Sequence, residues 1–225
     1  IEFVDLRAVD LAGRFRHVTL PAARLTEDLV TQGVAFDGSN YGYRAVTSSD
    51  MVLVPDLSTA YVERRESERV LALIGDIVEA DSRAPALVDP RGIARRAEGH
   101  LRASGIGEAA LVSPEFEFYV FEQAMFESEA GHSTVEMVPF EGREHRTRAA
   151  LGTGASAYHA PLPQDRLFSL RNEIARQIES AEIPVKYHHH EVGPFGQVEV
   201  ELGFAPLLRL ADATLIIKHI VRNVA

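Results

Sequence analysis

Residues 111–121 read L-V-S-P-E-F-E-F-Y-V-F, an apolar run that carries two glutamates, Glu115 and Glu117. Successive side chains of an extended strand point to opposite faces, so this spacing places both carboxylates on one face. Carboxylates within a strand are costly to bury unless a metal ion, a basic partner or solvent compensates them. The stretch therefore predicts either a metal-binding strand or a half-exposed edge strand with an acidic face.

The composition is that of an acidic globular protein. The 225 residues include 23 basic and 33 acidic side chains, which gives a formal net charge of −10. This charge disfavours nucleic acid and anionic membranes as partners, and leaves small molecules and metal ions as candidates. The sequence has no cysteine, so it has no disulfide or thiolate metal site, as fits a cytoplasmic protein. No apolar run approaches the roughly 20 residues that span a bilayer.

The N-terminal part predicts a small α+β domain over residues 1–84. Its expected strands are a hairpin over residues 1–20 and single strands over residues 51–55 and 70–78. Pro21 favours the start of a short helix that Gly33 ends. Residues 36–43, F-D-G-S-N-Y-G-Y, predict a turn that offers side-chain oxygens at a loop tip.

A second domain is predicted over residues 85–225, after a polar boundary that contains a proline. Asp89 and Pro90 favour the start of a helix that ends at Gly105. Its expected apolar stripe consists of Ile93, Ala94, Ala97 and Leu101.

The rest of this domain alternates between irregular and helical segments. Residues 122–150 are charged and turn-rich, which predicts a surface excursion such as a hairpin. Gly152 and Gly154 belong to a segment too short for a dinucleotide-binding loop, so they carry little chemical signal. Two amphipathic helices are expected over residues 165–181 and 207–225.

A second acidic stretch lies before the last of these helices. In V-K-Y-H-H-H-E-V, residues 185–192, strand alternation divides the polar side chains into Tyr187, His189 and Glu191 on one face and Lys186, His188 and His190 on the other. The next strand places Gln197, Glu199 and Glu201 on one face. The G-P-F-G loop between them is short enough for a hairpin that brings Glu191 close to Glu199.

Glu115, Glu117, Glu191 and Glu199 thus form two acidic pairs. Converging carboxylates repel one another unless divalent cations lie among them, and oxygen ligands favour Mg²⁺ or Mn²⁺ over zinc. Such ions typically bind nucleotide phosphates. The alternative is that the histidine run and the second pair are a solvated strand face, and each motif taken separately fits that alternative.

Taken together, these motifs resemble the bacterial type I class of glutamine synthetases. The motifs follow in family order as F-V-D-L-R at residues 3–7, F-D-G-S-N at 36–40, S-D-M-V-L-V-P-D at 49–56, S-P-E-F-E-F at 113–118, H-H-H-E-V with G-Q-V-E at 188–199, and H-I-V-R-N-V-A at 219–225. The resemblance implies a β-grasp N-terminal domain followed by the first half of an α/β catalytic domain with a curved antiparallel sheet. It also implies a dodecamer whose active sites lie between neighbouring subunits.

The resemblance implies a role for each candidate residue. Glu117, Glu191 and Glu199 would hold one Mg²⁺ or Mn²⁺, and Glu115 would contribute to a second. Asp37 would bind ammonium and take its proton. Nucleotide or phosphate contacts are implied for Tyr158, Lys186, His189, Gln197 and Phe204. The implied reaction is ATP-dependent ligation of ammonia to L-glutamate through γ-glutamyl phosphate, in the cytoplasm.

Departures from the family pattern keep two alternatives open. Asn40 stands where a second serine is common, Lys186 where a nucleotide-contacting glutamate is often found, and V-E-L-G-F at residues 200–204 where V-A-T-R-F is common. The alternatives are a γ-glutamyl ligase that uses an organic amine and a non-catalytic assembly protein of the same family. Because the family's remaining metal ligands, phosphate arginines and flap would follow residue 225, the chain is expected to be inactive alone.

Overall fold

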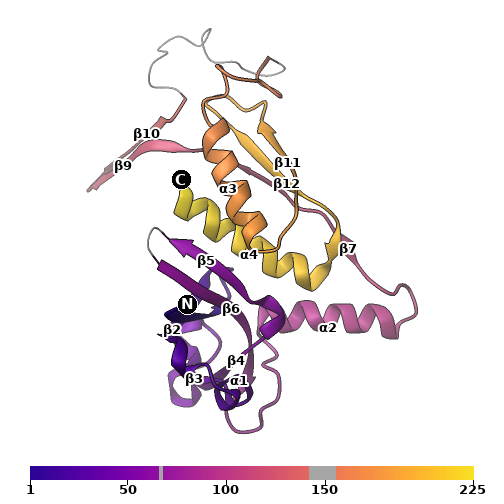
Figure 1. Cartoon of the computed structure of the whole chain (residues 1–225). Coiled ribbons are helices and arrows are strands. Elements are labelled where there is room, and N and C mark those ends of the chain that lie inside the picture. Colours follow the sequence, from indigo (N-terminus) through magenta and orange to yellow (C-terminus); the bar gives the residue numbers. More distant parts are fainter. Residues whose placement is uncertain (66–67, 142–155) are drawn as a thin grey trace. The chain divides into compact units, whose positions relative to one another are not determined.

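The computed structural model describes residues 1–65, 68–141 and 156–225, which fall into two compact units (Figure 1). The first unit comprises residues 1–112, 177–183 and 204–220, and the second comprises residues 113–176, 184–203 and 221–225. No helix among the described residues is both long and apolar enough to cross a membrane.

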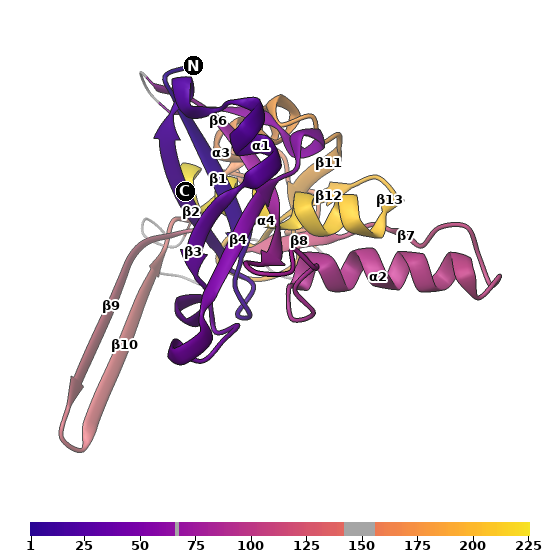
Figure 2. The same cartoon turned by 90° about the horizontal axis from the view of Figure 1, so that it is seen from below.

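The first unit is built on a six-stranded sheet with the order β2-β1-β6-β4-β3, in which β5 also pairs with β6 (Figure 2). The strands are β1 (Phe3–Val9), β2 (Phe15–Pro21), β3 (Val34–Asp37), β4 (Asp50–Pro55), β5 (Tyr61–Arg65) and β6 (Glu68–Glu79). Only β1 and β6 run parallel among these pairs, so the intervening strands and helix α1 (Glu27–Gln32) form the long crossover that parallel neighbours need. The predicted hairpin and both predicted single strands are confirmed, whereas β3 and β5 were not predicted.

The helix expected to start at Pro21 is interrupted. A 3₁₀ turn (Ala22–Arg24) comes first, and α1 begins after Thr26, whose hydroxyl oxygen accepts a hydrogen bond from the Leu29 N–H at 3.2 Å. The prediction of one helix was wrong because Thr26 is a helix cap in its own right. Gly33 ends α1 as predicted: its φ is 73°, and a Cβ there would clash with the Leu53 carbonyl oxygen.

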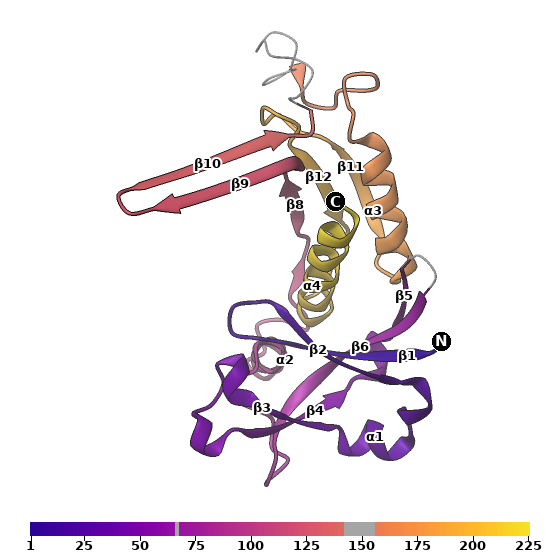
Figure 3. The same cartoon turned by 90° about the vertical axis from the view of Figure 1, so that its left-hand side faces the viewer.

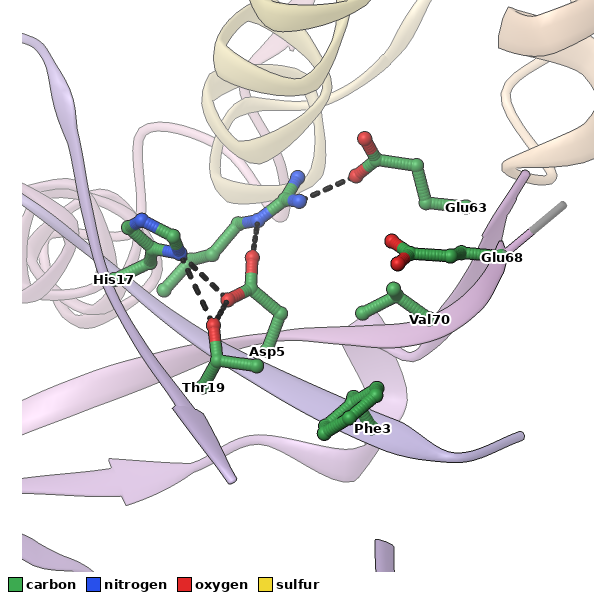
Figure 4. Close-up of a pocket in the computed structure, with 8 residues that line it drawn as sticks. Phe3, Asp5, His17, Thr19, Glu63, Glu68 and Val70 are labelled. Carbon is green, nitrogen blue, oxygen red and sulfur yellow. Dashed lines mark hydrogen bonds and ion pairs between the residues drawn. The ribbon is translucent and has the colours of Figure 1, made fainter. Parts of the chain in front are cut away.

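A buried ion cluster links β1, β2 and β5 beside a cavity of about 270 Å³. Arg7, which is 2% exposed, donates from Nε to Asp5 Oδ2 at 2.8 Å and also pairs with Glu63. Figure 4 shows His17 and Thr19 hydrogen-bonded to Asp5 from β2. Burial raises the pKa of Asp5, but hydrogen bonds with His17, Thr19 and Arg7 outweigh it and hold the pKa below its ordinary value. This cluster contains its own cation.

Helix α2 (Pro90–Ala103) starts as predicted, because the Asp89 carboxylate accepts hydrogen bonds from two N–H groups of the first turn. The predicted apolar stripe was wrong: Ile93 is 50% exposed, and the buried side chain is Arg91. The Arg91 guanidinium donates to Asp212 at 3.0 Å and to Asp56 at 2.6 Å. Ion pairs rather than apolar periodicity therefore hold this helix in place.

Helix α4 (Leu207–Val224) confirms the last predicted helix. Its buried positions are Leu210, Asp212, Ala213, Ile216, Ile217 and Ile220. Strand β13 (Ala205–Pro206) immediately precedes α4 and pairs antiparallel with β7 (Leu111–Val112), which also belongs to the first unit. The apolar core under the main sheet includes Val4, Leu6, Met51, Leu53, Leu73 and Ile77.

The second unit contains a three-stranded antiparallel sheet in the order β11-β12-β8. Its strands are β8 (Glu115–Phe118), β11 (Val185–His190) and β12 (Val198–Leu202). A hairpin of β9 (Phe121–Glu129) and β10 (His132–Pro139) extends away from this sheet as a long ribbon (Figure 3). Helix α3 (Phe168–Ser180) begins three residues later than predicted.

The predicted strand over residues 111–121 is divided among β7, β8 and the start of β9. Pro114 lies between β7 and β8, and a proline has no N–H to donate to a sheet. The hairpin β9–β10 confirms the predicted excursion for residues 122–139. Gly152, Gly154 and the predicted excursion over residues 142–150 lie outside the described residues.

Candidate metal centre

One face of the three-stranded sheet carries two rows of polar side chains. In the register of the strands, Glu201 lies opposite both Tyr187 and Glu115. The second row has Glu199 opposite both His189 and Glu117. We call these six side chains the carboxylate face.

The central strand fixes which residues reach this face. In V-E-V-E-L of β12, Val198 and Val200 are 0% exposed and Leu202 is 2% exposed, so the alternate positions bury apolar side chains. A strand whose apolar positions are buried cannot shift by one residue without exposing them. The alternation therefore holds Glu199 and Glu201 on the carboxylate face.

A first group of possible metal ligands gathers around Glu199. His189, Glu191 and Glu199 each offer a ligand atom, and these atoms lie within 4.8 Å of one another. The His189 Nδ1 is 3.4 Å from a Glu191 carboxylate oxygen, and its Nε2 is 3.6 Å from one of Glu199. The hairpin thus brings Glu191 close to Glu199, as predicted. Glu117 is not in this group and accepts a hydrogen bond from Gln197 Nε2 at 2.7 Å.

A tight turn sets the position of Glu191. Its N–H donates to the Gln197 carbonyl oxygen at 2.8 Å, just beyond the end of β11. Gly193 donates its N–H to the Gln197 side-chain oxygen at 2.9 Å, and a Cβ on Gly193 would clash with Gln197 and with the Tyr119 hydroxyl. A Cβ at residue 193 would force these side chains to move, so the turn favours glycine there.

A second group consists of Glu115, Glu199 and Glu201, whose ligand atoms also lie within 4.8 Å of one another. Glu199 and Glu201 are 7% and 6% exposed, whereas Glu115 is exposed. Burial, with the charges of Glu115 and Glu191, outweighs His189 and raises the pKa of Glu199. Carboxylate oxygens suit Mg²⁺ or Mn²⁺. The carboxylate oxygens of this second group therefore fit the divalent ions that the sequence predicts.

Lys186 contradicts the predicted alternation. The pairing of β11 with β12 skips Lys186 between Val185 and Tyr187, which is a β-bulge. Lys186 Nζ donates to Glu201 Oε1 at 2.6 Å and lies 4.8 Å from the centre of the Tyr187 ring. The prediction that Lys186 shares a face with His188 and His190 was wrong, because strict alternation fails at a bulge.

Two of the three consecutive histidines are held by other partners. The His188 Nδ1 accepts a hydrogen bond from Arg171 Nε at 3.3 Å, and His190 Nε2 lies 2.9 Å from a Glu141 carboxylate oxygen. The hydrogen bond with Glu141 raises the pKa of His190, whereas burial and Arg171 lower that of His188. Of the three histidines, only His189 is part of the carboxylate face.

Of the three remaining predicted site residues, Tyr158 contacts the carboxylate face, whereas Asp37 and Phe204 belong to the first unit. Tyr158, in the second unit, stacks on His159 at 3.9 Å between ring centres and meets the His189 ring at 5.3 Å. Asp37, in the first unit, accepts hydrogen bonds from the Ser39 hydroxyl at 2.6 Å and the Ser39 N–H at 2.9 Å, which lower its pKa. Phe204, also in the first unit, is 74% exposed.

Sequence reasoning placed Glu201 on this face but assigned it no role. The contact between Lys186 and Glu201 depends on the β-bulge, and no residue type in the sequence indicates this bulge. It also missed Glu141, whose partner His190 is 49 residues away in the sequence. Contacts at that separation leave no periodic pattern.

Comparisons with known proteins match both the N-terminal and the C-terminal part of the chain to one family. The model described as "Glutamine synthetase, beta-Grasp domain" matches residues 1–80, and "Glutamine synthetase, catalytic domain" matches residues 87–225. The glutamine synthetase of Azotobacter vinelandii is 34% identical over 236 residues, which cover 100% of this chain and 50% of that protein. A protein of Cupriavidus pinatubonensis named 3-hydroxylaminophenol mutase is also 34% identical, over 233 residues, with the same coverage of 100% and 50%.

Solved structures show the same fold. The electron cryomicroscopy structure of Plasmodium falciparum glutamine synthetase gives a TM-score of 0.88 at 21% identity, and covers 100% of this chain and 45% of that one. The chain thus spans about half the length of the relatives it matches. The predicted fold class, a β-grasp domain followed by part of an α/β catalytic domain, is confirmed. Since the two family models together match residues 1–80 and 87–225, the chain belongs to the glutamine synthetase family.

Proposed function

We propose that this chain forms the first half of an ATP-dependent ligase that joins ammonia to L-glutamate through γ-glutamyl phosphate. The observation that supports this proposal is that Glu191 converges with His189 and Glu199 of the carboxylate face. In the proposal, Glu117, Glu191 and Glu199 hold one divalent ion and Glu115 contributes to a second. Bound Mg²⁺ or Mn²⁺ would supply positive charge to the phosphates of ATP.

The other predicted residues take part in substrate binding in this proposal. Tyr158, Lys186, His189, Gln197 and Phe204 contact the nucleotide or its phosphates. Asp37 binds ammonium and accepts its proton in a neighbouring subunit's site, which requires a homo-oligomer such as a dodecamer. The hydrogen bonds that lower the pKa of Asp37 favour its ionised form, as binding of a cation requires.

The proposed domain boundary lies between residues 84 and 85, within the polar segment that separates the two helix-and-sheet patterns. The proposed compartment is the cytoplasm, which fits a sequence without cysteine. The chain alone is expected to lack activity, because the carboxylate face supplies ligands from only part of the catalytic domain.

Lys186 and Glu201 favour a second candidate, a γ-glutamyl ligase that uses an organic amine. Both residues depart from the family pattern given above, and they contact one another at 2.6 Å beside the proposed metal ligands. A changed lining next to the reacting groups alters which acceptor fits.

Manganese binding by the 225-residue chain tests the proposed ligands directly. Titration followed by electron paramagnetic resonance should show binding by the wild-type chain and a loss of at least about 100-fold in affinity in Glu199→Gln, which removes a carboxylate shared by both groups. Glu173→Gln, on the exposed side of α3, changes the charge equally and should bind like wild type. Equal binding by both variants would contradict the assignment.

Phosphate release tests the reaction, measured on the protein in which this chain is joined to a complete catalytic domain. Release that requires ATP, L-glutamate and ammonia together supports the first candidate. Release with an organic amine but not with ammonia supports the second. No release with either acceptor, in a preparation that binds Mn²⁺, would contradict both and favour a non-catalytic assembly protein.

A further inference from the structure

Lys186 is an unusual residue in this chain. Of the 23 basic side chains only Lys186 and Lys218 are lysines, and the other 21 are arginines. A β-bulge in β11 turns Lys186 toward Glu201 on the carboxylate face. Bulges next to functional sites commonly re-aim a side chain in this way. The backbone is therefore built to bring one ammonium group to this face.

Several contacts hold that ammonium group in place. Its Nζ donates to Glu201 Oε1 at 2.6 Å and lies 4.8 Å from the centre of the Tyr187 ring, within the range of a cation–π contact. The Tyr187 hydroxyl also hydrogen-bonds Glu201. The Lys186 side chain is 48% exposed whereas that of Glu201 is 8% exposed, so the cation lies at the solvent side of a buried carboxylate.

Glu201 is also placed to act as a metal ligand, in competition with its ion pair to Lys186. One of its carboxylate oxygens is within 4.8 Å of oxygens of Glu115 and Glu199, close enough for all three to hold one ion. A divalent ion there would compete with Lys186 for Glu201 and would repel its ammonium group. Glu199 belongs to both groups of ligands, so occupation of the Glu201 group also affects the group around His189.

We propose that Lys186 is a built-in counter-ion that occupies Glu201 and thereby directs divalent ions to Glu191 and Glu199. A lysine suits this role because its ammonium is a compact charge on a flexible stem, which can move when an ion approaches. The inference rests on the proposed function only in assuming that the carboxylate face binds divalent ions. It makes Lys186 and Glu201 positioning residues for the metal.

Manganese affinity of four variants tests the proposal in the 225-residue chain. Lys186→Met should bind Mn²⁺ about tenfold more tightly, because it removes a positive charge near the ion and frees a carboxylate. Lys186→Arg keeps the charge and should bind within about twofold of wild type. Glu201→Gln should bind about tenfold more weakly, because Lys186 then lacks its partner. The double variant K186M/E201Q removes the pair without changing net charge and should return toward wild type.

A spectroscopic readout follows Lys186 itself. Lysine labelled with ¹³C at Cε gives two resonances in this chain, and Lys218→Arg identifies which is which. Titration with Mg²⁺ should shift the Lys186 resonance at the concentrations that fill the site. A lysine that only stabilises the strand would keep its resonance unchanged, which would contradict the proposal.

The outcomes separate this inference from the proposed function. Wild-type binding with equal or weaker binding by Lys186→Met would overturn the role of Lys186 and leave the metal site standing. No binding by wild type and none by Lys186→Met would overturn both. Manganese binding with the expected variant order, but no glutamine formation by the complete protein, would overturn the proposed reaction alone. If Lys186→Met does not fold, the Mn²⁺ affinities of Lys186→Arg and Glu201→Gln decide the question.

Discussion

The Asp5 cluster of the first unit and the Glu199 cluster of the second unit differ in how the charge of their buried carboxylates is balanced. In the first unit, Asp5 and Glu63 flank Arg7, so the cluster carries its own guanidinium. In the second unit, Glu199 has one histidine and further carboxylates as neighbours, and burial raises its pKa. The acids of the first cluster therefore need no added cation, whereas the acids around Glu199 carry an excess of negative charge that a divalent ion would offset.

Removal of the internal cation should have the largest effect. Arg7→Met removes the guanidinium that Asp5 and Glu63 share, and should lower the free energy of unfolding by about 3–5 kcal/mol. Urea unfolding of the chain measures this. Arg14→Met is the control: Arg14 also pairs with a buried aspartate but is 62% exposed, so its loss should cost about 1 kcal/mol or less. Similar losses of stability in both variants would contradict the difference expected between a buried and an exposed arginine.

Asp5→Asn should have an intermediate effect that depends on pH. The folded-state pKa of Asp5 lies below the ordinary 3.8, so its contribution is complete above that value and is lost as pH falls through the lower folded value. We expect the variant to lose about 1–3 kcal/mol at pH 7. Its difference from wild type should shrink as pH falls below about 4. A difference that stays constant down to pH 2 would show that Asp5 acts through packing alone.

Glu199→Gln should have the smallest effect on stability, with the opposite sign. Its raised pKa means that ionisation of Glu199 at neutral pH disfavours the folded state, so removing the charge should stabilise the metal-free chain by about 1 kcal/mol or less. Thermal unfolding with and without Mn²⁺ measures this. Mn²⁺ should raise the midpoint of wild type and leave that of the variant unchanged. A destabilised metal-free variant would place Glu199 with the structural acids.

The sequence predicted most of the fold where local patterns decide it. The alternation in residues 1–20 gave the hairpin, and Asp89 with Pro90 gave the start of α2. The predicted apolar stripe on α2 was wrong, because the buried residue is Arg91, which forms ion pairs with aspartates far along the chain. Periodicity counts apolar residues and does not detect a guanidinium that replaces them.

The candidate site was likewise predicted only where local patterns determine it. The spacing of Glu115 with Glu117, and that of Glu199 with Glu201, predicted that each pair shares one face of its own strand, and the register of the three strands agrees with this. The bulge at Lys186 was beyond prediction because it depends on how β11 pairs with β12. A pattern with a period of two assumes perfect pairing, so it fails at each bulge.

The alternation of β12 also limits how genes for such chains can change. Since Glu199 and Glu201 share one side of the strand and Val198, Val200 and Leu202 the other, each glutamate can be replaced independently by point mutation. Loss of a single codon within the strand, by contrast, would move the residues on one side of the deletion to the opposite face and expose apolar side chains that are now buried. Over evolutionary time, insertions and deletions should therefore collect in the surrounding loops, while the five codons of β12 keep their number and vary only in identity.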